Sequence, residues 1–379
     1  MSAQQAIAAD HVFDGAVVHR NAAVVIDGAQ VAGIMPRDEV PSGVAVRALD
    51  GAWLAPGFID IQVNGGGDVL FNDHPTPEGI ATIAAAHRRF GTTGLLPTLI
   101  SDTPEKMRAA LAAVDAIIGR EPGVLGIHLE GPFLSPEKPG VHNVRVLREP
   151  TREDAALLTA PHQGVTLVTL APEQVPAGFI AELVGAGVRV SLGHSMATYA
   201  QTRAAMAEGL SGFTHLFNAM RPLTSRDPGP IPAALESPNA WFGMIVDGVH
   251  VDPAVLRLAL RGRARPILVT DAMPPVGGKR PTFALYGEEI MVKDEACARR
   301  DGTLAGAYLD MATAVRNAVR LLGVTLEDAL RMASTHPAGF IGLGDVLGRL
   351  APGYRADVVA FDPTTVRVMD TWVAGHSGE

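Results

Sequence analysis

Two segments, GVLGIHLEGP at residues 123–132 and GVRVSLGHS at residues 187–195, are short apolar strands that end in side chains able to bind a metal. Five further segments repeat the apolar pattern, and most of them also end in such side chains or in groups able to move a proton: GLLPTLI (94–100), VTLVTLAPE (165–173), GFTHLFNAM (212–220), WFGMIVDGVH (241–250) and PILVTDAM (266–273). When parallel strands close into a barrel, their carboxyl ends converge on one mouth. The pattern therefore predicts a parallel barrel with an enzyme site at that mouth.

The two ends of the chain have a different pattern from the middle. Residues 6–53 alternate short apolar stretches with Gly, Asp and Asn turns, which is typical of small antiparallel strands. The segment PGFIDIQVNG (56–65) is the first candidate barrel strand, and strand and helix signals alternate after it. Residues 344–363 return to short strands and turns.

We therefore predict an α/β fold, namely a (β/α)8 TIM-type barrel with a small discontinuous β-sandwich domain formed by both chain ends. The expected boundaries are 1–54 for the first part of the small domain, 55–339 for the barrel and 340–379 for the second part. The helix signals within the barrel are clear. Thr103 and Pro104 suit the start of a helix whose apolar stripe runs from Met107 to Ile118.

Length and charge narrow the possible classes of protein. The chain has 379 residues, 47% of them hydrophobic, so a barrel of about 250 residues leaves room for one small domain. A net charge of -9 and a sequence pI near 5.7 argue against a nucleic-acid partner, which needs a basic face. Cys297 is the only cysteine, so no disulfide within the chain is expected and a reducing cytoplasm is compatible.

No targeting or membrane segment is expected either. Residues 1–15 lack the positive and sustained apolar regions of a signal peptide. No segment approaches the ~20 consecutive apolar residues that a membrane-spanning helix needs. A cytoplasmic protein without a membrane partner is the expectation.

Three residues are candidate metal ligands. Glu130, His194 and His215 end three different predicted strands, and a catalytic divalent ion typically takes three such ligands and activates a water. Taken singly, each has an ordinary alternative, as a solvated strand end for the glutamate or a hydrogen-bonded structural residue for a histidine. Their common position at one predicted rim favours the metal site.

Other side chains near the rim could move protons or bind substrate. Asp271 follows the last strand, where a carboxylate could exchange a proton with a water and a leaving group, although it could also cap a helix. His142 and His250 could polarise a carbonyl or meet an anion, and a surface-loop role is equally open for each. Arg226 presents a fork suited to phosphate, but a solvated surface arginine is the common alternative.

The first barrel strand indicates how many metals to expect. Two-metal sites of this barrel type use His-x-His on that strand, whereas Gln62 and Asn64 stand here, and amides are poor ligands for a transition ion. We therefore predict a single-metal site. His128 points to the same side of its strand as Glu130, and either supports the site or packs inside the barrel.

Several motifs in order resemble the amidohydrolase superfamily. These are PGFID (56–60), the strand-end ligands and the closing segment THPAGFIGLGDVLGRLAPGYRADVVAFD (335–362). Further segments are similar to the N-acetylglucosamine-6-phosphate deacetylase family: HLEGPFL (128–134), TLAPE (169–173), LGHSMAT (192–198), THLFNAM (214–220), DGVHVDP (247–253), VTDAM (269–273) and DGTLAGA (301–307). The resemblance spans nearly the whole chain.

This resemblance implies roles for particular residues. Glu130, His194 and His215 would bind one divalent ion per subunit, zinc or alternatively iron, cobalt or manganese. Asp271 would be the catalytic acid and base, and His142 would polarise the acetamide carbonyl. The implied substrate-binding residues are Val141, His142, Asn218, Ala219, Arg226, Asp247, His250, Leu304, Ala305 and Gly306.

The resemblance also implies a partner and a reaction. The chain would form a homodimer in which Arg226 reaches the neighbouring site, and it would release acetate and glucosamine 6-phosphate from the acetylated sugar phosphate. Rival interpretations are deacetylation of N-acetylgalactosamine 6-phosphate, hydrolysis of a cyclic amide and a non-catalytic scaffold. Cyclic-amide hydrolases commonly bring His-x-His and a bridging lysine, neither of which is evident, and a scaffold would be expected to lack some of the candidate site residues.

Overall fold

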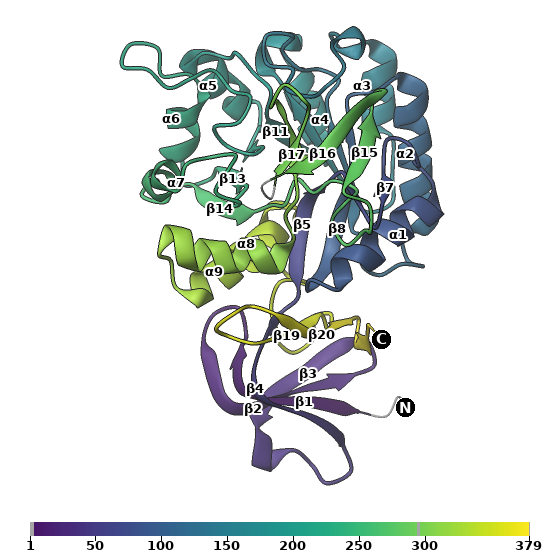
Figure 1. Ribbon diagram of the computed structural model, residues 1–379, viewed down its shortest axis with the longest axis vertical. Coiled ribbons are helices and arrows are strands. Elements are labelled where there is room, and N and C mark those ends of the chain that lie inside the picture. Colours follow the sequence, from purple (N-terminus) through teal and green to yellow (C-terminus); the bar gives the residue numbers. More distant parts are fainter. Residues whose placement is uncertain (1–3, 294–295, 379) are drawn as a thin grey trace.

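The computed structural model describes residues 4–293 and 296–378, which form a large lobe and a smaller one (Figure 1). In this part of the chain, eight parallel strands make one sheet in the order β14-β13-β12-β11-β10-β9-β8-β5. Their bounds are β5 Phe58–Val63, β8 Thr92–Ile100, β9 Gly126–Glu130, β10 Val165–Leu170, β11 Arg189–Leu192, β12 Gly212–Phe213, β13 Trp241–Met244 and β14 Arg265–Leu268.

The sheet closes where its first and last strands meet. A parallel bridge joins Val63 to Ala272, and the backbone N–H of Asp271 donates to the carbonyl of Gln62 at 3.0 Å. The predicted barrel is confirmed. Because β5 lies beside β14 at this closure, side chains more than 200 residues apart in sequence share one end of the barrel.

In the described part of the chain, seven α-helices connect the successive barrel strands, as the alternating signals predicted, and three more follow the last of these strands. They are α1 Pro77–Arg88, α2 Pro104–Ile117, α3 Arg152–Thr159, α4 Phe179–Gly185, α5 Tyr199–Ala207, α6 Pro230–Leu235, α7 Pro253–Ala259, α8 Met311–Asn317, α9 Leu326–Ala333 and α10 Thr335–Phe340. The Thr103 side chain accepts from the N–H of Lys106 and so caps α2, which confirms the predicted start of that helix. Short helical turns lie at η1 Arg37–Glu39, η2 Val144–Val146, η3 Pro172–Gln174 and η4 Ala318–Leu322.

Both ends of the chain build the smaller lobe. Its described strands are β1 Gln5–Phe13, β2 Val18–Asp27, β3 Gln30–Pro36, β4 Ala45–Pro56, β19 Val358–Phe361, β20 Val368–Val373 and β21 His376–Ser377. They hydrogen-bond in the order β21-β20-β19-β4-β1-β2-β3, and β19 runs antiparallel to β4 with Ala360 opposite Leu54. The predicted discontinuous β-domain is confirmed.

A further small sheet lies on the side of the barrel away from the smaller lobe (Figure 1). Among the described residues it contains four antiparallel strands, β15 Thr282–Leu285, β16 Glu288–Lys293, β17 Ala296–Ala298 and β18 Leu304–Ala307. The short hairpin of β6 Gly65–Gly66 and β7 Val69–Leu70 follows β5. This four-stranded sheet was not predicted from the sequence, and it brings residues 304–306 to the barrel through a bridge between Ala307 and Ala272.

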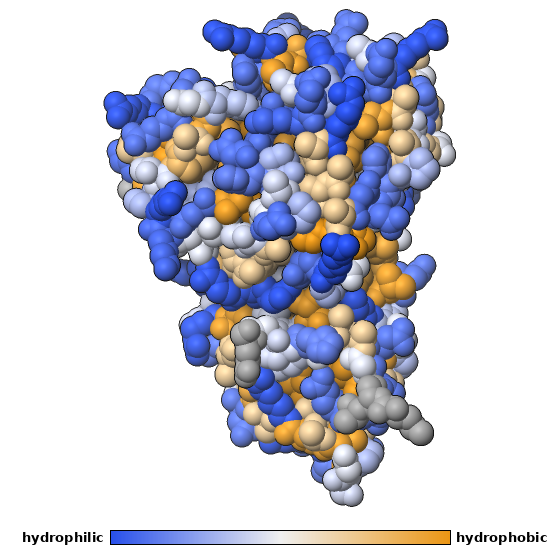
Figure 2. Space-filling view, turned by 90° about the vertical axis from the view of Figure 1, so that its right-hand side faces the viewer, coloured by the Kyte–Doolittle hydropathy of each residue, from blue (hydrophilic) through white to orange (hydrophobic). Residues whose placement is uncertain are grey.

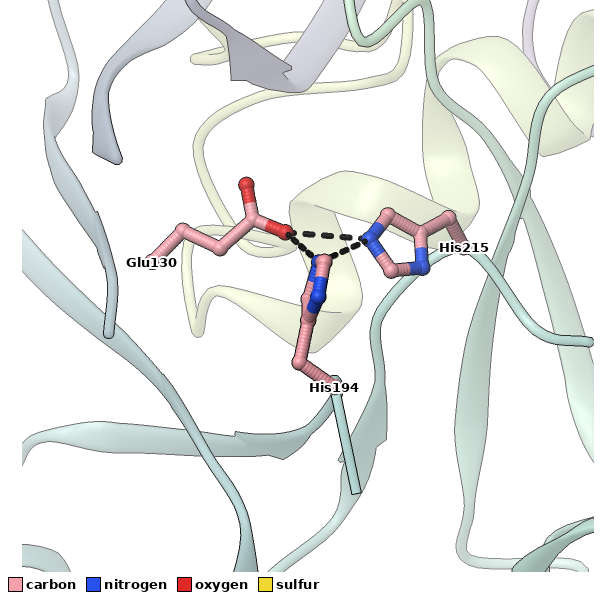
Figure 3. Close-up of side chains that lie close together, drawn as sticks. All are labelled: Glu130, His194 and His215. Carbon is pink, nitrogen blue, oxygen red and sulfur yellow. Dashed lines mark hydrogen bonds and ion pairs between the residues drawn. The ribbon is translucent and has the colours of Figure 1, made fainter. Parts of the chain in front are cut away.

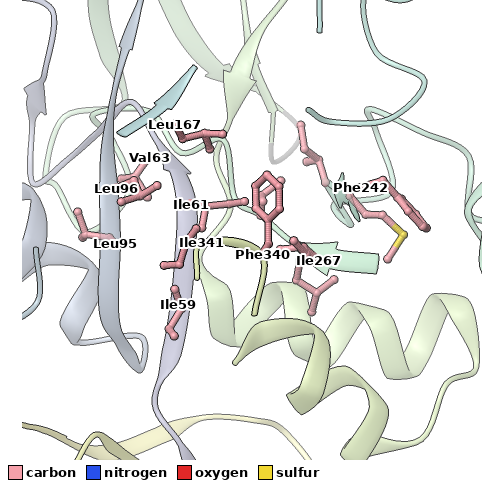
Figure 4. Packing of buried hydrophobic residues seen from close by; sticks show 14 of the residues in the cluster. Ile59, Ile61, Val63, Leu95, Leu96, Leu167, Phe242, Ile267, Phe340 and Ile341 are labelled. Carbon is pink, nitrogen blue, oxygen red and sulfur yellow. The ribbon is translucent and has the colours of Figure 1, made fainter. Parts of the chain in front are cut away.

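Apolar side chains fill the barrel beneath its mouth. Figure 4 shows Phe340 of α10 reaching between Ile61 of β5 and Ile267 of β14, and all three line one small interior space. A separate cluster that includes Ile7, Leu54 and Trp372 forms the core of the smaller lobe. On the face seen in Figure 2, hydrophobic and hydrophilic residues are interleaved over both lobes. Among the described residues, no helix has the length and apolar character needed to cross a membrane.

Candidate active site

The candidate residues lie at or just beyond the carboxyl ends of barrel strands. Glu130 is the last residue of β9, while His194, His215 and Asp271 follow β11, β12 and β14 by two or three residues. The last three have φ angles of +47°, +31° and +51°, in the left-handed region that side chains with a Cβ rarely adopt. Such strain persists only where the surrounding structure enforces it, and it concentrates at functional sites.

Glu130, His194 and His215 point toward one another (Figure 3). Oε1 of Glu130 lies 3.2 Å from Nε2 of His194 and 3.0 Å from Nε2 of His215, and the two imidazole nitrogens are 3.1 Å apart. All three side chains are buried. One carboxylate oxygen and two imidazole nitrogens within 4.8 Å of one another form a donor set that could hold a metal ion.

The hydrogen bonds around His194 fit this interpretation. Its Nδ1 lies 2.8 Å from the carbonyl oxygen of Lys138, which can only accept. Nδ1 therefore carries a proton in either charge state of the ring, and if the ring loses its other proton, the lone pair of Nε2 is directed at the cluster. A carbonyl that orients a metal-binding histidine in this way is a common feature of metal sites.

The charges within the cluster support one another. Burial opposes ionisation of Glu130, but hydrogen bonds from His194 and His215 outweigh it and hold the pKa of the carboxyl well below its usual value. Burial likewise opposes a charge on His215, yet its contact with Glu130 raises the pKa of that imidazole. The buried carboxylate of Glu130 thus attracts positive charge to its oxygen. A bound divalent cation would supply such a charge.

Asp271 lies beside this cluster and is held by the two amides of the first strand. Its Oδ1 accepts from Nδ2 of Asn64 at 2.7 Å and from Nε2 of Gln62 at 3.1 Å, and the same Gln62 amide also reaches Oε2 of Glu130 at 3.3 Å. Burial, followed by the negative charge of Glu130, raises the pKa of Asp271 to about 6. A carboxyl of that pKa can both take and return a proton near neutral pH.

His142 approaches from the opposite wall. Its ring lies 4.4 Å from that of His194, centroid to centroid, and its Nδ1 contacts Ser101. Burial, followed by the positive charge of His194, lowers the pKa of His142 to about 3, so the ring is neutral near pH 7. A neutral ring can donate a hydrogen bond to a substrate without carrying charge into the site.

These groups line one cavity of about 150 Å³ that opens to solvent. Its lining contains Asn64, Ile100, Glu130, Gly140, Val141, His142, His194, His215, Asn218, Ala219, Ile245, His250, Asp271, Met273, Leu304 and Gly306. The metal-ligand candidates, the candidate base and most of the candidate substrate-binding residues therefore lie together.

Three predicted substrate-binding residues lie outside this lining. Asp247 sits behind His250 and its Oδ2 lies 2.5 Å from Nδ1 of that ring, so it orients His250. Ala305 is fully buried between two residues that line the cavity. Arg226 lies in the exposed loop before α6, and the structure of the single chain does not place it in the cavity.

Some residues of the site were absent from the sequence predictions. Ser101, Ile245 and Met273 either contact His142 or line the cavity. Ser101 directly follows the strand that ends in Ile100, so the strand-end rule applied to other residues could have indicated it. Ile245 and Met273 are apolar and give no chemical signal in the sequence. His128 proves to be interior, because its ring bonds the Ile61 carbonyl and the Thr169 hydroxyl.

Known proteins share this sequence and architecture. A 44% identical relative, over 86% of this chain and 84% of its own length, is an N-acetylgalactosamine-6-phosphate deacetylase from Shewanella sp. (strain ANA-3). The crystal structure of N-acetylglucosamine-6-phosphate deacetylase from Pasteurella multocida matches with a TM-score of 0.95 and 35% identity over 99% of both chains. A point mutant of the Mycobacterium smegmatis enzyme, in complex with N-acetyl-D-glucosamine-6-phosphate, matches with a TM-score of 0.90 and 33% identity over the whole of both chains.

The family assignment rests on more than these individual relatives. The model of the amidohydrolase family matches residues 53–377, which include every barrel strand and the whole candidate site. The metal-ligand candidates, the candidate base and the cavity all lie inside the matched region. The chain belongs to the amidohydrolase family.

Proposed function

We propose that this protein is a metal-dependent hydrolase that deacetylates N-acetyl-D-glucosamine 6-phosphate to D-glucosamine 6-phosphate and acetate. The observation that carries the proposal is the meeting of Glu130, His194 and His215 with Asp271 and His142 around one cavity. Such a set offers a cation site, a proton carrier and a neutral hydrogen-bond donor within one enclosure. The Pasteurella and Mycobacterium structures named above support the choice of sugar phosphate.

One divalent cation per subunit would be held by Glu130, His194 and His215. Zinc is the proposed ion, with iron, cobalt or manganese as alternatives, because a carboxylate and two imidazoles suit all of these. When bound, the ion supplies Lewis acidity that polarises a carbonyl and makes water a better nucleophile. Gln62 and Asn64 direct amide donors at Asp271 instead of offering imidazoles for a second ion.

The residues of the chain then have defined tasks. Asp271, held by the two amides, takes a proton from the attacking water and later returns it to the nitrogen of the breaking amide bond. His142 donates a hydrogen bond to the acetyl oxygen, where negative charge develops. His250, oriented by Asp247, faces the cavity and would contact the sugar phosphate, while Asn218, Ala219, Leu304 and Gly306 enclose the sugar.

We further propose that the active protein is a cytoplasmic homodimer that acts in amino-sugar recycling. Arg226 is exposed and lies outside the cavity of its own chain, which is the arrangement expected if it reaches the phosphate in a neighbouring subunit. A single buried cysteine fits a reducing compartment.

Deacetylation of N-acetylgalactosamine 6-phosphate is a second candidate, favoured by the 44% identical Shewanella relative. The two substrates differ at one sugar hydroxyl. Acetate release from both sugar phosphates, measured together with the metal content of the purified protein, tests both candidates. Release from the glucosamine compound at the higher kcat/KM supports the first candidate, and no release from either compound would refute both.

A further inference from the structure

Ser101 makes a close contact with the ring of His142 that no role assigned above uses. It lies immediately after β8, and both residues are buried. The backbone N–H of Ser101 donates to Nδ1 of His142 at 3.2 Å, and its hydroxyl oxygen lies 2.7 Å from the same nitrogen. The backbone N–H and the hydroxyl of Ser101 thus face a single ring nitrogen, and the hydroxyl has a second, longer contact of 3.4 Å with the carbonyl oxygen of Glu130.

This geometry decides where the ring carries its proton. A backbone N–H can only donate, so Nδ1 must present its lone pair to Ser101. The neutral ring then holds its proton on Nε2. Nε2 has no hydrogen-bond partner within residues 4–293 and 296–378, and His142 lines the cavity, so this N–H is available to a substrate.

A glycine beside the candidate metal ligand makes room for the Ser101 hydroxyl. Gly131 directly follows Glu130, has a φ of +88°, and a Cβ built on it would lie 2.1 Å from Oγ of Ser101. Any other residue at position 131 would push the hydroxyl away from the ring of His142. The position of the Ser101 hydroxyl therefore depends on the glycine that directly follows Glu130.

We infer that Ser101 is a positioning residue that fixes the tautomer of His142, so that Nε2–H donates to the acetyl oxygen of the substrate. This inference rests on the proposed function and deepens it. As the water oxygen bonds to the carbonyl carbon, one water proton passes to Asp271 and the π electron pair moves onto the acetyl oxygen. His142 stabilises that oxygen through the Nε2 hydrogen bond and keeps its own proton, and Asp271 then protonates the nitrogen as the C–N bond breaks.

The first test determines directly which ring nitrogen of His142 carries the proton, in the full-length, metal-loaded protein. With histidines labelled with ¹⁵N, the NMR signals of His142, assigned by comparison with His142→Asn, distinguish a protonated from an unprotonated nitrogen at each position. The inference expects the proton on Nε2 in the unaltered protein and a smaller, but still predominant, share of that tautomer in Ser101→Ala, which loses the hydroxyl donor and keeps the longer backbone contact. A proton found on Nδ1 in the unaltered protein would overturn it.

The second test uses kinetics and a double-mutant cycle. Ser101→Ala is expected to lower kcat roughly tenfold, the factor for loss of one hydrogen bond, with KM nearly unchanged. Ser101→Cys, which retains a weak donor, should recover part of that loss. Ser334→Ala removes another buried hydroxyl far from the cavity and serves as the matched control.

In a His142→Asn background, Ser101→Ala should cause no further loss of kcat, because Ser101 acts through the ring. Full additivity of the two losses would show that Ser101 acts only on the stability of the fold, and would overturn the inference. Failure of the proposed function would appear separately, as no acetate release by the unaltered protein, whereas the ring spectrum needs no turnover.

Discussion

At the scale of single residues, Asp271 takes part in both proton transfers of the proposed reaction, the one from the attacking water and the one to the nitrogen of the breaking amide bond. Its Oδ1 accepts from the amides of Gln62 and Asn64, whereas Oδ2 has no hydrogen-bond partner within residues 4–293 and 296–378 and can exchange a proton. The same carboxyl is close enough to Glu130 for that negative charge to raise its pKa. Its backbone is also strained, with a φ of +51°, so the local fold maintains this position at a cost in stability.

We expect Asp271→Asn to lower kcat by about 10²- to 10⁴-fold, the usual contribution of a general acid and base. Asn keeps the shape and an oxygen for the two amide donors but cannot accept the proton. Metal content and the affinity for substrate, measured by calorimetry, should change little. Unaltered turnover would contradict the role given to Asp271.

The buried carboxyl of Asp60 should make the free energy of unfolding depend on pH. Burial raises the pKa of this carboxyl from 3.8 to about 7, although Thr270 donates to its Oδ2 at 2.5 Å. The folded protein therefore holds a proton that the unfolded chain releases above about pH 4. Its contribution is complete below that pH, and the free energy of unfolding should fall as the pH rises toward 7, by up to about 4 kcal/mol from this group.

Replacing Asp60 by Asn should flatten this dependence, because Asn does not titrate. Urea unfolding at several pH values between 4 and 8 measures the effect. Asp345→Asn, at an exposed position, is the matched control and should leave the pH dependence unchanged. Equal slopes for the Asp60 variant and the unaltered protein would be the contrary result.

At the scale of elements, the sheet of β15 to β18 forms one wall of the cavity through Leu304 and Gly306. Its β15–β16 turn is tied to the end of β8, because the Tyr286 hydroxyl donates to the carbonyl of Ser101 at 2.6 Å. This contact links a peripheral sheet to the barrel rim.

Loss of that link should loosen the wall. Tyr286→Phe is expected to raise KM about fivefold, equivalent to about 1 kcal/mol for one hydrogen bond. Tyr308→Phe is the control, since this exposed hydroxyl has no hydrogen-bond partner in the described part of the chain. Steady-state kinetics measures both, and equal KM values for the two variants would speak against the link.

Some of these elements could be predicted from the sequence, and others could not. The barrel was predictable because strongly apolar strands such as β5 and β8 alternate with capped helices. The site was predictable because a residue at the carboxyl end of such a strand can be recognised in the sequence, and these ends meet at one mouth of a barrel. The sheet of β15 to β18 was not, because its strands are short and partly exposed and lack a clear period of two. The contact of Ser101 with His142 was equally hidden, since it depends on a loop that returns 41 residues later.

At the scale of the whole molecule, the proposed homodimer makes each site depend on both chains. Asp271 and Arg226 of one chain would serve different sites, so the variants Asp271→Asn and Arg226→Ala would each have little activity alone when assayed at a substrate concentration far below the KM of Arg226→Ala. Mixed and reassembled, they should recover about a quarter of the unaltered activity, because half the dimers are hybrids and each hybrid has one complete site. Absence of recovery in verified hybrids would refute the contribution in trans.

Arg226→Ala alone should chiefly weaken the binding of the phosphorylated sugar. Its kcat/KM on N-acetyl-D-glucosamine without phosphate should equal that of the unaltered protein, because no charge pair is lost there. A loss of the same size on both compounds would contradict a phosphate contact.

The pairing of β4 with β19 has a consequence for how the polypeptide is made. These two strands are separated by some 300 residues in the sequence, so β1 to β4 emerge from the ribosome long before β19 is synthesised. Until then the backbone groups along the free side of β4 lack their final neighbour and are open to wrong pairing between nascent chains. Any premature stop that removes β19 would leave that side permanently open, so even a late nonsense mutation that spares every active-site residue should yield aggregates instead of enzyme.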